Sequence, residues 1–349
     1  MSSVSELLGE LRSGPGRRYY RPSPGNAGDA LIAAGFYHLA ERLDVPFTEL
    51  PGGALDAVGP TADDVLILAG GGWLTSHWDF GAPTLTALTR LDAALVLLPQ
   101  SLSGNADALR RLRPRDVLFV RERYSLAYAR SLGLRCRVLL DHDLALHVDP
   151  RRLLAAPESG PARLGSARLG SARPGRLPGR RELERSVALG YHRLAARRGG
   201  TLRAWRVDAE ASGAHPGARW RDDLSLVANH GVLDRDSALR SASTLLRTLA
   251  RYDRVETDRL HIGIGAALLG RPVRLHANAY HKIRGIYGYS LRDDSRFGSL
   301  VEFVGFVGAG EQGTGACGFD GAAVDGARVR VNDAGGDARP PTAADARHR

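Results

Sequence analysis

The 349-residue sequence has few of the features that cross-link a chain or anchor it in a membrane. Its two cysteines, Cys136 and Cys317, lie far apart, which argues against a disulfide framework and against a cysteine-based zinc site. No apolar run approaches the roughly 18 residues that cross a bilayer, and residues 1–14 lack the order of a secretory signal. We therefore expect a soluble, cytoplasmic protein with no transmembrane segment.

Lysine is almost absent as well. Of the 48 lysine and arginine residues, only Lys282 is a lysine. An ammonium group is a compact point charge, whereas guanidinium is a planar fork, so the two are not interchangeable at a tight anion site or proton-transfer site. Because Tyr280 and His281 precede it, we interpret Lys282 as a site residue; drift on a surface loop is the alternative.

The net charge of +10 would ordinarily suggest nucleic acid as a partner. Residues 151–185, however, contain nine arginines and three glutamates, a surplus of six, within a stretch rich in Gly, Ser and Pro. Most of the excess charge therefore lies in a predicted flexible linker rather than in a folded basic groove, and we expect no nucleic-acid partner. Such a segment would suit anionic lipids at the inner face of the membrane.

The hydrophobic pattern predicts an α/β protein. Residues 65–72, 94–101, 117–123 and 137–146 are near-continuous apolar runs, typical of parallel strands covered on both faces, and helix-forming stretches separate them. This pattern predicts a Rossmann-like, doubly wound domain over residues 1–150.

A second set of α/β segments follows the linker and predicts another Rossmann-like domain over residues 186–306, with a disordered tail over 307–349. Helices are expected at about 236–251 and 260–269. The remaining apolar segments, which we assign mainly to strands, are 186–192, 201–208, 224–229, 254–258 and 272–278. Two such domains predict a ligand cleft at the carboxyl ends of their strands.

The first candidate binding loop comprises Gly25, Asn26, Gly28 and Asp29, just before a helical pattern. Glycines at a strand-to-helix turn let backbone N–H groups approach a ligand, and the helix N-terminus favours an anion. Asp29 either caps the helix or accepts a sugar hydroxyl. A tight, capped turn with no ligand is an equal alternative.

A second glycine cluster, which includes Gly71 and Gly72, directly follows a predicted strand and so lies where open α/β sheets bind ligands. Neither cluster fits the dinucleotide fingerprint, and neither carries the Lys-Ser/Thr of a phosphate-binding P-loop. Trp73, His77 and Trp78 come next, either as a platform for sugar stacking or as packing residues.

Candidate charged residues end two later strands. Arg206 either binds a carboxylate or phosphate bidentately or pairs with its neighbours Asp208 and Glu210.

Further on, Asp258, Arg259 and His261 occur where a strand enters a helix, whose dipole would support a bound anion. A histidine, with an ordinary pKa of about 6.5, suits general acid or base catalysis at neutral pH. A lone histidine at such a position is more often structural, but with Arg259 beside it and Lys282 one βα unit later we favour a functional role.

The acidic segment Asp141, His142 and Asp143 would suggest a metal ion. Alternate residues of a strand point to opposite faces, so we interpret this segment as a solvated strand end and predict no metal.

Taken together, these motifs resemble the polysaccharide pyruvyl transferase family. The similarity runs in family order over about residues 21–290, and its most specific part is 256–287, ETDRLHIGIGAALLGRPVRLHANAYHKIRGIY. The resemblance implies a GT-B-like arrangement with an interdomain cleft. It also implies transfer of the enolpyruvyl group of phosphoenolpyruvate to two hydroxyls of a sugar, as a cyclic ketal with release of phosphate. No cofactor is expected.

By the same resemblance, Arg259 and His261 would engage phosphoenolpyruvate, with His261 as the acid/base. Asn278, Tyr280 and Lys282 would complete that side, and the Gly25–Asp29 loop would line the opposite wall. The acceptor would be a sugar of a polysaccharide or its precursor, free or lipid-linked. A GT-B glycosyltransferase that uses a nucleotide sugar, and a non-catalytic carbohydrate-binding protein, are the alternatives.

Overall fold

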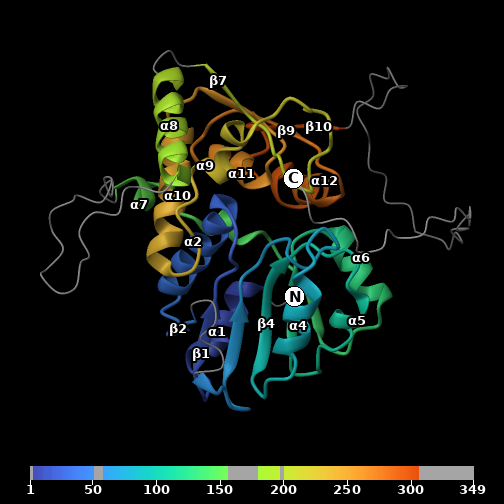
Figure 1. Cartoon of the computed structure of the whole chain (residues 1–349). Coiled ribbons are helices and arrows are strands. Elements are labelled where there is room, and N and C mark those ends of the chain that lie inside the picture. The colour runs from blue at the N-terminus through green and yellow to red at the C-terminus, as the bar shows by residue number, and fades with distance from the viewer. Residues whose placement is uncertain (1–2, 51–57, 156–179, 197–199, 306–349) are drawn as a thin grey trace, which may run out of the picture. The chain divides into compact units, whose positions relative to one another are not determined.

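Two parallel β-sheets organise the chain (Figure 1). The computed structural model describes residues 3–50, 58–155, 180–196 and 200–305. Residues 1–306 form one compact unit, which contains both sheets. The predicted α/β class with parallel sheets is confirmed.

The first sheet has six strands in the order β2-β1-β3-β4-β5-β6. Its strands are β1 (Arg18–Arg21), β2 (Thr48–Glu49), β3 (Val65–Leu68), β4 (Ala94–Gln100), β5 (Val117–Val120) and β6 (Arg137–Leu140). Its helices are α1 (Val4–Arg12), α2 (Ala27–Arg42), α4 (Gly81–Leu88), α5 (Ala106–Leu109) and α6 (Arg123–Ser131). Neighbouring residues of β3 face opposite sides, because Leu66 and Ile67 belong to different hydrophobic clusters. Burial on both faces explains the continuous apolar runs.

The second sheet has four strands in the order β10-β9-β8-β7. They are β7 (Thr201–Ala204), β8 (Arg254–Thr257), β9 (Val273–His276) and β10 (Val301–Val304). The helices of this half are α8 (Arg180–Ala195), α9 (Leu224–Val227), α10 (Arg235–Leu249), α11 (Leu260–Leu268) and α12 (Lys282–Ile286), with a π-helical turn over Tyr287–Leu291. Short 3-10 turns at Leu144–His147 and Trp220–Asp222 and helix α7 (Pro150–Ala155) complete the described elements.

One hydrophobic cluster joins the two sheets. It includes Ile67 of β3, Leu31 of α2, Leu246 of α10, Ile264 of α11 and Val255 of β8. Helix α2 of the first half and helix α10 of the second lie side by side in Figure 1. The two sheets therefore share one apolar core.

Three sequence-based expectations need correction. Residues 186–192, expected as a strand, lie in helix α8, where Ala188 and His192 are buried at the four-residue spacing of a helix. Residues 224–227 form helix α9 instead of a strand. Helices α7 and α8 also occupy both ends of the predicted linker, whose remainder, 156–179, lies outside the described residues, as does 307–349.

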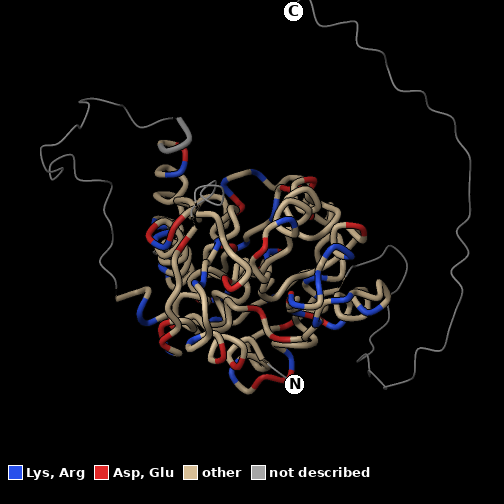
Figure 2. Tube along the Cα trace, turned by 90° about the horizontal axis from the view of Figure 1, so that it is seen from below, with Lys and Arg blue, Asp and Glu red and all other residues tan. Residues whose placement is uncertain are grey.

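Basic and acidic positions are interspersed along the described chain, as the tube in Figure 2 shows. Among the described residues, no helix is long and apolar enough to cross a membrane.

Candidate functional site

The loop before α2 is a capped strand-to-helix turn. Asn26 is the N-cap residue and accepts a hydrogen bond from the Gly28 N–H at 2.8 Å, while the Asp29 carboxylate accepts from the Asn26 N–H at 2.9 Å. Together they form a capping box, which satisfies backbone donors that a helix start leaves free. The capping role weighed for Asp29 is therefore confirmed. A Cβ on Gly25 would lie 2.0 Å from Asp29 Oδ2, so this close approach requires glycine.

Helix α11 begins directly after β8, as predicted. Arg259 is its N-cap residue, and His261 lies in the first turn. A Cβ on Gly28 would lie 2.9 Å from His261 Nδ1, so the imidazole packs directly on the start of α2. This contact brings together the two motifs that the sequence separates by more than two hundred residues.

His261 contacts a buried ion pair. The Nε2 atom of His261 lies 3.3 Å from Asp143 Oδ2, and the same carboxylate oxygen accepts a hydrogen bond from Arg121 Nη1 at 2.7 Å. Asp143 and Arg121 side chains are each only 1% exposed. Burial would raise the pKa of the Asp143 carboxyl, but the charges of His261 and Arg121 outweigh it and hold that pKa below its usual range.

The prediction of a solvated strand end is therefore wrong for Asp143. Its carboxylate contacts and orients the imidazole of His261. Sequence reasoning missed Arg121 as well, although it lies in the VRER segment that contributed to the family resemblance. One sequence feature could have indicated that Asp143 belongs to the site: two acids, Asp141 and Asp143, follow directly after an apolar strand.

Arg259 is held by two carboxylates. Its Nε lies 3.1 Å from both oxygens of the buried Asp223, Nη2 also bonds Asp223, and Nη2 lies 2.8 Å from Asp208 Oδ2. Asp223 was not among the candidate residues; nothing in the local sequence distinguishes it. These contacts use Nε and Nη2, so among the described residues the Nη1 donors of the guanidinium remain for another acceptor.

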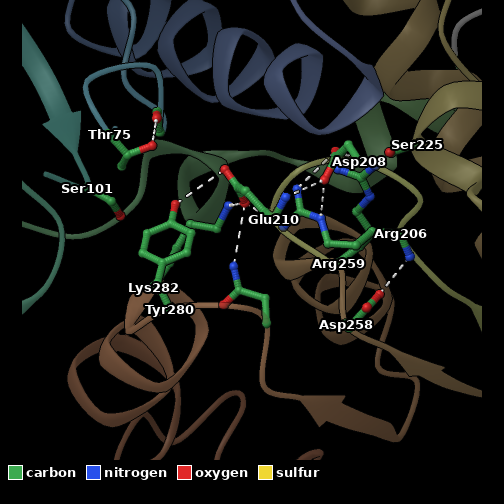
Figure 3. A network of polar contacts seen from close by, with 12 residues as sticks. Thr75, Ser101, Arg206, Asp208, Glu210, Ser225, Asp258, Arg259, Tyr280 and Lys282 are labelled. Atoms are coloured by element: carbon green, nitrogen blue, oxygen red, sulfur yellow. Dashed lines mark hydrogen bonds and ion pairs between the residues drawn. The ribbon is translucent and has the colours of Figure 1, made fainter. Parts of the chain in front are cut away.

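Glu210 lies at the centre of a second network (Figure 3). Its buried carboxylate pairs with Lys282 and Arg206 and accepts hydrogen bonds from Tyr280 Oη at 3.3 Å and Trp78 Nε1 at 3.2 Å. Arg206 also contacts Asp208, so the alternative that Arg206 pairs with its neighbouring acids is confirmed.

Asn278 Nδ2 adds a fifth donor, 3.5 Å from Glu210 Oε2. Burial would raise the pKa of Glu210, but the charges of Lys282 and Arg206 outweigh it and hold that pKa below its usual range. Burial lowers the pKa of the Lys282 ammonium to about 8, and Glu210 offsets this only in part. At slightly alkaline pH, close to the pKa of about 8, the Lys282 side chain is therefore only partly protonated.

These networks border one cavity of about 290 Å³. Nine of the candidate residues line it: Gly25, Asn26, Gly28, Asp29, Gly72, Arg206, Arg259, His261 and Lys282. The cavity thus brings the guanidinium, the imidazole and the ammonium of the predicted site together.

Four candidates do not line the cavity. Asn278 and Tyr280 lie behind Glu210, and Asp258 accepts a hydrogen bond from the Arg206 N–H at 2.8 Å. Gly71 has a φ of 137°, which favours glycine, and its backbone pairs with Pro99 and Ser101 to extend the β3–β4 ladder. These four residues position the lining.

The charged groups of the lining nearly balance. Arg121, Arg206, Arg259 and Lys282 are opposed by Asp29, Asp208 and Glu210. Among the described residues, Lys282 donates a hydrogen bond only to Glu210, so two of its three ammonium protons remain available. An anion would therefore bind through hydrogen-bond donors that are not already used in these ion pairs. No group of three or more metal-binding side chains occurs in the described part of the chain.

The fold and the site define an α/β protein whose cavity, rich in cationic donors, lies between two parallel sheets. The family model for polysaccharide pyruvyl transferases matches residues 26–279, which covers eight of the ten strands of the two sheets and most of the cavity lining. The chain belongs to the polysaccharide pyruvyl transferase family.

A solved structure of an uncharacterized protein from Klebsiella pneumoniae subsp. pneumoniae NTUH-K2044 is similar in fold. The two chains share 23% sequence identity with a TM-score of 0.63, over 86% of this chain and 96% of the Klebsiella chain. No curated protein matches the sequence.

Proposed function

We propose that the protein transfers the pyruvyl group of phosphoenolpyruvate to two hydroxyls of one sugar, forming a cyclic ketal and releasing phosphate. The observation that carries this proposal is the shared cavity of Arg259, His261 and Lys282. The donor has a carboxylate and a phosphate, and cationic donors with two helix N-termini suit such a molecule. The proposal also places the two sheets in a GT-B-like arrangement.

The donor anion would use the hydrogen-bond donors that the ion pairs leave over. These are the remaining ammonium protons of Lys282 and Nη1 of Arg259. The pairs themselves hold the cations in place before the donor arrives, so little reorganisation is needed on binding. Neither a metal ion nor a nucleotide cofactor has a step in this chemistry.

His261 is the proposed acid and base. A proton moves from the imidazolium to the methylene carbon of phosphoenolpyruvate, which becomes a methyl group and leaves an oxocarbenium-like centre at C2. The first sugar hydroxyl attacks C2, and its proton returns to the imidazole. The bond between C2 and the phosphate oxygen then breaks, and phosphate leaves with the bonding electrons. The second hydroxyl attacks C2 and closes the ring, and the leaving phosphate takes up its proton. Asp143, which contacts the imidazole, would stabilise the imidazolium before it donates its proton and after the proton returns.

The acceptor is a sugar of a polysaccharide or of its precursor. A lipid-linked acceptor would bring the protein to the inner face of the membrane, and the arginine-rich residues 151–185 suit an anionic lipid surface. Deleting the segment between 156 and 179 should then reduce sedimentation with vesicles that contain phosphatidylglycerol. Equal sedimentation of both proteins would end the lipid hypothesis.

The test is a screen of candidate acceptor glycans with phosphate release from phosphoenolpyruvate as the readout. The proposal expects phosphate only when an acceptor is present. Thermal stabilisation by a nucleotide sugar, and not by phosphoenolpyruvate, would instead indicate a glycosyltransferase. Binding of an acceptor without any phosphate release, across the screen, would indicate a carbohydrate-binding protein.

A further inference from the structure

One side of the cavity is aromatic. The loop between β3 and α4 contributes Trp78 and Phe80, which we call the aromatic wall, and Trp73 lies buried beside them. The ring centroids of Trp78 and Phe80 are 6.3 Å apart, with 47° between their planes. Phe80 is 45% exposed although it is a large apolar residue. Beside the charged groups of its lining, the cavity therefore presents aromatic ring surface along one side.

The loop that carries this wall is held in one conformation. Thr75 Oγ1 donates to the Gly72 carbonyl at 2.9 Å, and the Trp78 N–H donates to the Thr75 carbonyl at 3.2 Å. A Cβ on Gly81 would lie 2.1 Å from the Trp73 carbonyl oxygen, so the start of α4 packs against the loop backbone. The rings are thus placed before any ligand binds.

Phe80 breaks a local rule of helix structure. It is the N-cap residue of α4, where Ser, Thr, Asp and Asn are preferred, and it makes no side-chain cap hydrogen bond. Phe80 therefore lacks the stabilising cap hydrogen bond and also exposes an aromatic ring to solvent. Departures of this kind from local preference are expected where function outweighs stability.

Trp78 connects the aromatic wall with the cationic side. Its indole N–H donates to Glu210 Oε1 at 3.2 Å, and Glu210 in turn pairs with Lys282 and Arg206. A ligand on the aromatic wall would consequently lie next to an anion held by Lys282. Asp29 and Ser23 offer oxygen acceptors in the same cavity, and Asp29 uses one carboxylate oxygen, Oδ2, in the α2 cap.

We propose that Trp78 and Phe80 form the subsite for the acceptor sugar, and that they bind the C–H face of a pyranose ring. A pyranose is apolar on its ring faces and polar at its edges, which fits ring surface on one side and carboxylate or hydroxyl acceptors around it. This inference rests on the proposed function for the identity of the donor beside it. It assigns the two aromatic residues to the acceptor and to no part of the donor.

The experiment uses the full-length protein without phosphoenolpyruvate. The probes are methyl β-D-galactopyranoside, methyl β-D-glucopyranoside and methyl β-D-mannopyranoside, observed by saturation-transfer NMR. At least one should receive saturation at its ring C–H protons. Phe80→Ala should weaken its Kd about fivefold to tenfold, the size expected for one lost aromatic contact, and Phe80→Trp should restore it. Tyr191→Ala is the control: it removes a ring that is 61% exposed on α8 and does not line the cavity, so the Kd for the sugar should stay unchanged.

Three results would overturn the subsite: no saturation of any of the three sugars, an unchanged Kd in Phe80→Ala, or saturation of uridine monophosphate in their place. Turnover separates this inference from the proposed function. With an active acceptor, Phe80→Ala should raise the acceptor KM and leave the KM for phosphoenolpyruvate unchanged. Sugar binding that depends on Phe80, with no phosphate release from any acceptor, would count against the proposed function alone.

Discussion

The two walls of the cavity differ in what they contribute. The wall from the first sheet contributes a capped helix start, glycines and aromatic rings, with Gly28 and Phe80 as its typical residues and Arg121 as its cation. The wall from the second sheet contributes most of the charged groups in ion pairs, among them Arg259 and Lys282. Under the proposed function, we expect the first wall to select the shape of the acceptor and the second wall to hold the charges of the donor. His261 is where they meet, because it belongs to the second wall and packs on the first.

Removing the group at this meeting point should have the largest effect. His261→Ala should lower turnover about a hundredfold to ten-thousandfold, the usual contribution of a general acid or base. Phosphate release with phosphoenolpyruvate and a sugar acceptor measures it, and circular dichroism checks the fold. His142→Ala is the matched control, because His142 is exposed and does not line the cavity. A wild-type rate from His261→Ala would remove its assigned role.

The charged support of that imidazole comes next. Asp143→Asn keeps the shape of the side chain but leaves Arg121 buried without its countercharge, which should cost about 3–5 kcal/mol of unfolding free energy. Urea denaturation at neutral pH measures the loss. Because the folded pKa of Asp143 lies below its unfolded value, its contribution is complete above a pH of about 4 and is lost as the pH falls. The difference between wild type and variant should therefore shrink in acid; a constant difference contradicts the assignment.

A single methyl group tests the contact between the walls. Gly28→Ala places a Cβ 2.9 Å from His261 Nδ1 and 3.0 Å from His261 Cβ, so the imidazole must shift away. We expect kcat to fall about tenfold, because the displaced imidazole should raise the activation free energy by about 1.4 kcal/mol, which corresponds to that factor. Gly9→Ala is the control, because no heavy atom among the described residues lies within 4 Å of its Cβ. If both variants keep wild-type kcat, the contact between the walls has no catalytic importance.

The smallest expected effect concerns only the charged wall. The pKa of Lys282 is about 8, so its ammonium is charged below that pH and neutral above it. The KM for phosphoenolpyruvate should therefore rise several-fold as the pH increases from 7 to 9, with an inflection near the Lys282 pKa of about 8. In Lys282→Arg the side chain stays charged, so this inflection should disappear. The same inflection in both proteins would assign the titration to another group.

Local features of the site were predictable from sequence, and long-range partners were not. The cap at Asn26 and Asp29 and the start of α11 at Arg259 depend on residues within a few positions of one another. Asp143 lies 118 residues from His261, and Glu210 lies 72 residues from Lys282. The packing of the two sheets brings Asp143 to His261, whereas the strand order within the second sheet brings Glu210, which follows β7, near Lys282, which follows β9. Neither pairing can be read from the spacing of these residues along the chain.

The fold shows the same division. Strands β3, β4 and β5 are continuous apolar runs because both of their faces are covered, and the sequence alone located them. Residues 186–192 were assigned to a strand because the stretch is short and apolar, a pattern that cannot distinguish a strand from a helix segment. Its large apolar side chains, including Val187 and Tyr191, are in fact exposed on α8.

The shared core between the sheets has a consequence for how the molecule melts. Because α2, α10 and α11 bury side chains from both halves in one cluster, neither half can lose its packing without exposing apolar surface of the other. Scanning calorimetry should record a single heat-absorption peak whose calorimetric and van't Hoff enthalpies agree. Ligands would then bind in a cavity that is already formed, without a hinge motion between the two halves.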